Sequence, residues 1–115
     1  MLEHLRGGLR GGVHLFAAHR DVMRALFYMA QLDEEAVGGA MHRIEQNRTG
    51  GMAYLAGRLA DQGILRPDVT AAEAADLLWV LASFDCFDSL YTGRGLSADE
   101  VAHVLVTTAE RTLCR

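Results

Sequence analysis

The chain has 115 residues, of which 50% are hydrophobic and 23% are charged, a balance that is ordinary for a folded globular protein and excludes wholesale disorder. Its length suits one domain and is too short for two. The formal net charge is −4, so the chain lacks the concentrated basic surface that a protein needs to neutralise DNA phosphates. These totals predict a single folded domain that does not itself bind nucleic acid.

The composition favours helix throughout. Pro67 is the only proline, no segment alternates Val, Ile and Thr as a strand would, and Ala, Leu, Arg and Glu are helix formers. No apolar run approaches the roughly 18–20 residues that span a bilayer, and the start does not resemble a signal peptide. We therefore expect an all-α, cytoplasmic protein of about five helices with no membrane contact. Cys86 and Cys114 lack CxxC spacing, which predicts two free thiols.

The first predicted helix, residues 2–18, is interrupted by Gly7, Gly8, Gly11 and Gly12. Each glycine costs roughly 1 kcal/mol relative to alanine in a helix interior, so we expect a frayed helix that breaks near His19 and Arg20. No cap residue precedes its first apolar positions. This beginning is typical of a fragment of a longer protein, with the missing part upstream.

Two acidic residues mark the next helix starts. Asp21 begins a short, apolar second helix, and Asp33 begins a long third helix whose first turn holds Glu34 and Glu35, where the helix dipole favours negative charge. Gly63 ends this third helix. One apolar stripe runs down it, formed by Val37, Met41, Ile44, Met52, Leu55 and Leu59.

Capping boxes open the last two predicted helices. Thr70 with Glu73 begins a helix that we expect to continue to Tyr91, and Ser97 with Glu100 begins one that ends near Leu113. The first is apolar around nearly its whole circumference, so it requires cover from neighbours and, we expect, from a second subunit. The alternative is that both helices pack only within one subunit. The predicted dimer surface consists of Leu77, Leu78, Val80, Leu81, Phe84, Phe87, Val101, Val104 and Leu105.

The text ILRPDVTAAEAADLLWVL, residues 64–81, closely resembles the start of the penultimate helix in TetR-family transcriptional regulators. The resemblance extends to residues 56–63, to 95–100, and to 19–26, which are similar to the family's short helix before the long one. Arg20 and Phe84 each stand where many members of the family have proline. The missing proline at position 84 leaves the helix geometry near Phe84 open.

The resemblance implies an effector-binding and dimerisation domain. In such a domain the last two helices pair with the same two helices of a second subunit as a four-helix bundle. A bound small molecule then shifts two DNA-binding heads, and operator DNA is held by an N-terminal helix-turn-helix of about 45 residues. This chain contains no such segment, which indicates either truncation or a stand-alone relative. DNA would then be bound only through the missing N-terminal domain.

Methionine and aromatic side chains are the candidate contacts for a small apolar effector, because methionine adapts to irregular shapes and aromatic rings supply large contact areas. The alternative for each is simple core filling. His42 is either a polar group of the pocket or an exposed helix residue. The predicted ligand-binding residues are Met23, Phe27, Met41, Met52, Tyr54 and Trp79.

Catalytic and metal-binding patterns are not found in the sequence. The five histidines show no i, i+4 pairing and no HExxH motif, and the glycine pairs lack the lysine of a phosphate-binding loop. Cys86 lies in an apolar segment with no sign of a base to activate it. We therefore expect no catalytic residue, metal or cofactor. Two hypotheses remain, namely an effector-sensing regulatory domain and a helical dimerisation module without a ligand.

Overall fold

The computed structural model describes residues 2–32 and 34–115, and the side chains of residues 34–38, 40 and 41 fall outside that description. The described residues form helices joined by short loops and no strand, apart from one isolated antiparallel bridge between Leu65 and Cys114. The predicted all-α class is therefore confirmed. The helices are α1 (Leu2–Ala18), α2 (Arg20–Leu32), α3 (Glu34–Asp61), α4 (Ala71–Leu81), α5 (Phe84–Asp88), the π-helix η1 (Ser89–Gly93) and α6 (Ala98–Leu113).

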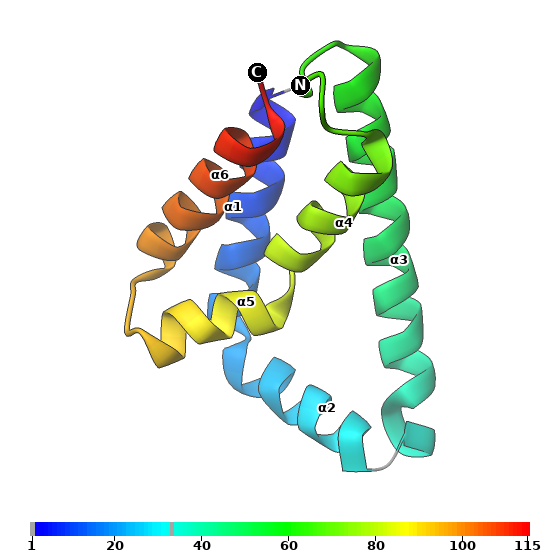
Figure 1. Ribbon diagram of the computed structural model, residues 1–115. Helices are drawn as coiled ribbons and strands as arrows, with labels where there is room; N and C mark the ends of the chain where they lie inside the picture. The colour runs from blue at the N-terminus through cyan, green and yellow to red at the C-terminus, as the bar shows by residue number, and fades with distance from the viewer. Residues whose placement is uncertain (1, 33) are drawn as a thin grey trace.

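The helices form a flat molecule that measures 43 × 30 × 19 Å. Helices α1 and α6 lie side by side, and α4 runs beside the long helix α3 (Figure 1). Helix α2 leaves the end of α1 at a steep angle and crosses to the start of α3, while α5 crosses near the far end of α4 (Figure 1). Both faces of α4 thus have neighbours within the subunit, with α3 on one side and α6 on the other.

Helix α1 is continuous, so the expectation of a frayed first helix was wrong. Leu5, Leu9 and Val13 follow one another at steps of four and are at most 5% exposed. Burying one such side chain contributes roughly 1.5–3 kcal/mol, which exceeds the roughly 1 kcal/mol that one interior glycine costs. The four glycines of α1 have no heavy atom within 4 Å of the position a Cβ would take. They weaken the helix locally, and packing of the buried stripe offsets the loss.

Among the described side chains of helix α3, the fully buried ones lie in its C-terminal half. Leu59 and Ala56 are fully buried and Met52 is half-buried, whereas Ile44 is 43% exposed. The stripe predicted from the sequence therefore leaves the core about midway along the helix. Its first two members, Val37 and Met41, lie outside the described side chains, as does the predicted cap Asp33. The helix ends as expected, since Gly63 adopts a positive φ of 67°.

The segment from Thr70 to Tyr91 is not one helix, which corrects the sequence-based expectation. Helix α4 ends at Leu81, and the next helix starts after Ser83, whose backbone is extended and whose Oγ accepts a hydrogen bond from the Cys86 amide at 3.1 Å. A serine side chain that satisfies a nearby amide offers the backbone an alternative to continuing the helix. The break lies beside Phe84, the position at which the sequence left the helix geometry open.

Both predicted capping boxes are confirmed. The Glu73 amide donates to Thr70 Oγ1 at 3.1 Å, and the Glu100 amide donates to Ser97 Oγ at 3.1 Å. In each case the glutamate side chain accepts a hydrogen bond in return from the backbone amide of the cap residue. These contacts fix the start of α4 and of α6 through residues three positions apart.

Candidate functional site: an apolar groove

One side of the molecule carries an open groove of about 840 Å³. Its walls come from Phe27 of α2, Arg48 of α3, Trp79 of α4, Cys86 of α5 and Thr108 of α6. Residues from five helices, spread over positions 27 to 108 of the chain, therefore converge on one space. A volume of this size falls in the range of roughly 300–1,000 Å³ that is usual for small-molecule sites in proteins.

Aromatic rings hold α2 against α5 at one wall of the groove. The rings of Phe27 and Phe84 are stacked, with centroids 5.4 Å apart and an angle of 9° between their planes. Phe84 also meets Phe16 of α1 edge to face at 5.4 Å and packs beside Phe87 at 5.8 Å. Phe84 is 5% exposed, so the helix break after α4 turns a large apolar ring into the core. This cluster anchors the groove wall.

Arg48 supplies the polar centre of the groove. Its Nη1 donates to the Trp79 carbonyl oxygen at 2.9 Å, and its Nη2 donates to Glu45 Oε2 at 3.1 Å. The guanidinium carbon also lies 4.7 Å from the centre of the Trp79 ring, within the range of a cation–π contact. The Arg48 side chain is only 18% exposed, whereas that of Glu45 is 32% exposed. Three contacts thus fix one charged group beside an apolar space.

Cys86 lines the same groove and is half-buried as a free thiol. Burial raises the pKa of its thiol above the ordinary value, because the thiolate would lose its hydration. The neutral thiol behaves as a small apolar part of the wall. This arrangement favours contact with a ligand over nucleophilic chemistry.

Two of the six predicted ligand-binding residues line the groove, namely Phe27 and Trp79. Met23 and Met52 are half-buried and pack against the core, as the core-filling alternative expects. Tyr54 lies on the outer side of α3 and is 70% exposed. The Met41 side chain lies outside the described residues, and His42 is exposed.

The pair of Glu45 and Arg48 was not predicted from the sequence. Their i, i+3 spacing on α3 is a visible signal for a helix-surface ion pair. It does not show that Arg48 reaches the backbone of Trp79, 31 positions further along the chain. That contact depends on α4 lying beside α3, which is a property of the tertiary structure.

Most of the predicted dimer surface is buried inside the subunit. Leu78, Phe87 and Val101 are completely buried, and Leu81, Phe84 and Leu105 are at most 8% exposed. The premise that these six side chains would face water in a lone subunit is therefore wrong, because all six belong to the buried core of the chain. Val80 and Val104 are 51% and 37% exposed, and Leu77 is half-buried. A dimer surface on these helices would consist of this smaller set, and its existence stays a prediction.

Comparison of the chain with protein-family models, curated proteins and solved structures gave no match. Among the described residues, no helix combines the length and apolarity required to cross a membrane. The same residues contain no cluster of three or more His, Cys, Asp or Glu side chains that could hold a metal ion.

Proposed function

We propose that this chain is the effector-binding and homodimerisation domain of a TetR-like transcriptional repressor. The observation that carries the proposal is the groove of about 840 Å³, where the Phe27 and Trp79 rings and the fixed Arg48 guanidinium meet. Ligand sites in proteins combine an apolar lining with a few oriented polar groups, and this groove has both. The resemblance of residues 64–81 to the TetR family supports the same function.

The two sides of the groove differ in how firmly they are held, which provides a route for signalling. The wall from α4, α5 and α6 contains buried residues in each helix, whereas α2 contains none. A ligand that contacts both walls stabilises the arrangement in which α2 lies against α5. An effector shifts a regulator only through such a difference in affinity between two arrangements.

A second copy of the chain would cover the exposed apolar residues at the edge of the groove. Val80 on α4 and Val104 on α6 both line the groove and are both substantially exposed. A standard interface buries about 600–1,000 Å² of each partner, roughly a tenth of the 7029 Å² surface of this chain. Pairing through α4 and α6 accords with the four-helix bundle that the resemblance implies.

The effector-binding role is tested by thermal unfolding of the purified chain against a panel of small aromatic and aliphatic metabolites. A ligand at 100 times its dissociation constant adds about 2.7 kcal/mol of stability, which is a readily measured rise in melting temperature. Phe27→Ala should reduce the rise for any compound that binds the groove, while Tyr54→Ala, at an exposed position outside it, should not. If no compound class raises the melting temperature, the sensing role is contradicted.

The exposure of Val80 and Val104 also supports the second candidate, a helical dimerisation module without a ligand. In that case a second subunit fills the groove. The two functions separate in one comparison, because the module predicts a stable dimer in sedimentation whose melting temperature responds to protein concentration and to no small molecule.

A further inference from the structure

We infer that the ligand of the groove is a flat apolar molecule with an anionic group, a carboxylate or a sulfonate, which binds to Arg48. The inference rests on the proposed function, namely that the groove takes a small molecule, and it specifies the chemical class. Arg48 is the one positively charged side chain among the described residues that line the groove. Its position beside the Trp79 ring places an anion-binding group at an aromatic surface.

The Arg48 guanidinium is pre-organised to bind an anion. Contacts with the Trp79 ring and the Trp79 carbonyl oxygen hold its plane, so little side-chain freedom remains to be lost on binding. A guanidinium has five N–H donors, and the hydrogen bond to the Trp79 carbonyl oxygen uses one of them, while the donor bound to Glu45 becomes free when a ligand anion replaces that carboxylate. The donors that remain can bind two oxygens of one carboxylate or sulfonate side by side.

The acidic residues of the groove are better hydrated than Arg48. Glu45 is held by one contact at the surface of α3 and can turn to water when another anion takes its place. Asp85 is exposed in the first turn of α5, where water stabilises its charge. Arg48 is the least exposed of the three, so its charge is the least screened. A cationic ligand would instead have to lie against this guanidinium.

The remaining lining favours a flat ring system. The stacked pair of Phe27 and Phe84 and the indole of Trp79 present aromatic surface to the same groove. Aromatic rings pack against one another in offset or edge-to-face geometry, which a planar ligand satisfies. Size and charge together point to an aromatic acid of a few fused or linked rings.

Two fluorescent probes with one aromatic skeleton test this inference. They are 1-anilinonaphthalene-8-sulfonate, which carries an anionic group, and N-phenyl-1-naphthylamine, which lacks it. Trp79 is the only tryptophan of the chain, so energy transfer from Trp79 to a probe reports binding near Trp79, and the Arg48 and Glu45 variants assign that binding to the groove. We expect the sulfonate probe to bind at least tenfold more tightly than the neutral probe, because only the sulfonate can accept a charge-assisted hydrogen bond from Arg48.

Variants of the ion pair assign the difference to Arg48. Arg48→Met should weaken the sulfonate roughly tenfold and leave the neutral probe unchanged, whereas Arg58→Met, at an exposed arginine of the same helix, should affect neither. Glu45→Gln removes the competing carboxylate and should tighten binding of the sulfonate alone. This opposite shift keeps the inference testable if Arg48→Met impairs folding, which circular dichroism would show.

The outcomes separate the chemical class from the proposed function. Equal affinity for the two probes, unaffected by the variants, would overturn the anionic class and leave small-molecule binding in the groove intact. Absence of energy transfer from Trp79 with either probe would overturn both. A preference for the sulfonate that disappears in Arg48→Met and increases in Glu45→Gln supports the inference.

Discussion

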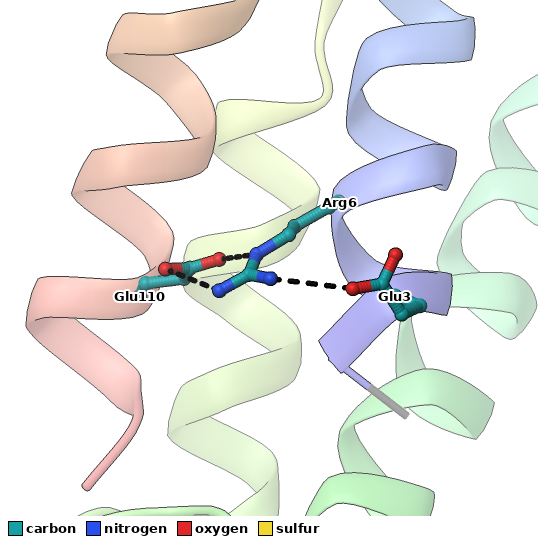
Figure 2. A network of polar contacts seen from close by, with 3 residues as sticks. All are labelled: Glu3, Arg6 and Glu110. Atoms are coloured by element: carbon teal, nitrogen blue, oxygen red, sulfur yellow. Dashed lines mark hydrogen bonds and ion pairs between the residues drawn. The ribbon is translucent and has the colours of Figure 1, made fainter.

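The guanidinium of Arg6 on α1 donates hydrogen bonds to both carboxylate oxygens of Glu110 on α6, which lies 104 positions further along the chain (Figure 2). The Nη2–Oε2 distance is 3.3 Å, and the Nε–Oε1 contact completes a two-pronged pair. Arg6 also contacts Glu3 at 3.4 Å through its third nitrogen (Figure 2). Glu110 is 27% exposed and Glu3 86% exposed, so water screens the two contacts very differently.

Removal of either partner of the Arg6–Glu110 pair should lower the melting temperature by a few degrees. The physical reason is that removal of a bidentate, partly buried ion pair costs more folding free energy than removal of a solvated ion pair. Glu110→Gln and Arg6→Met are the test variants, and Glu3→Gln is the matched control on the same guanidinium. Thermal unfolding by circular dichroism measures the effect. Equal melting temperatures for all three variants would contradict a stabilising role for the pair.

The same pair makes stability depend on pH in the acidic range. The hydrogen bond from Arg6 lowers the pKa of Glu110 below its ordinary value of 4.5. As the pH falls, the unfolded chain takes up this proton near pH 4.5 while the folded chain still excludes it, so the free energy of unfolding decreases through that window. Above it the stabilisation is fully present.

Glu110→Gln should therefore make the free energy of unfolding less dependent on pH below about 5. Part of the dependence should remain, because the Ser97 amide hydrogen-bonds to Glu100 and lowers the pKa of that carboxyl as well. Urea denaturation at several pH values gives the slopes. An unchanged slope in Glu110→Gln would show that the pair does not persist in solution.

Ser83→Ala should reduce the free energy of unfolding by about 1 kcal/mol, the usual contribution of an N-cap side chain. The substitution removes the acceptor of the Cys86 amide at the break between α4 and α5. Thr70→Ala serves as the comparison, because it removes a cap at the start of α4 without touching the groove. Ser83→Ala should in addition weaken binding of groove probes, since Ser83 and Phe84 form part of the wall. Thr70→Ala should leave probe binding unchanged.

Val104→Glu should yield a folded chain that sediments as a monomer, if two copies pair through α4 and α6. Val104 is 37% exposed, so a charge there meets water in a lone subunit and is buried at an interface. Leu78→Ala is the contrasting variant, because Leu78 is completely buried and its truncation should cost about 2–5 kcal/mol of stability without a specific effect on association. A soluble dimer of Val104→Glu would contradict the placement of the interface.

Local signals predicted the helix boundaries well. Capping residues and glycines act over three or four positions, so Thr70, Ser97 and Gly63 mark their helix ends by contacts that the sequence itself contains. Ser83 carried the same kind of signal, but the long apolar run around it concealed the break. The glycines of α1 predicted a frayed helix, whereas the helix is continuous. Packing of Leu5, Leu9 and Val13 against the rest of the core outweighs the local cost of the glycines.

The candidate site was predicted only in part. Phe27 and Trp79 were identified by residue type, and the structure places both in the groove. The apolar character of residues 70–91 led to the prediction of a second subunit, whereas Leu78 and Phe87 are buried within a single subunit. Apolar composition requires that a side chain be covered, and it does not specify what covers it.

The sequence by itself determined the helical class and the helix ends marked by Gly63, Thr70 and Ser97, since these depend on propensity and on contacts between near neighbours. Only the tertiary structure decided that Arg48 meets Trp79, that Phe27 stacks on Phe84, and that Arg6 pairs with Glu110. The physical reason is the separation along the chain of the residues that form each contact. Each of these contacts joins residues far apart in the chain, and their meeting depends on how whole helices pack.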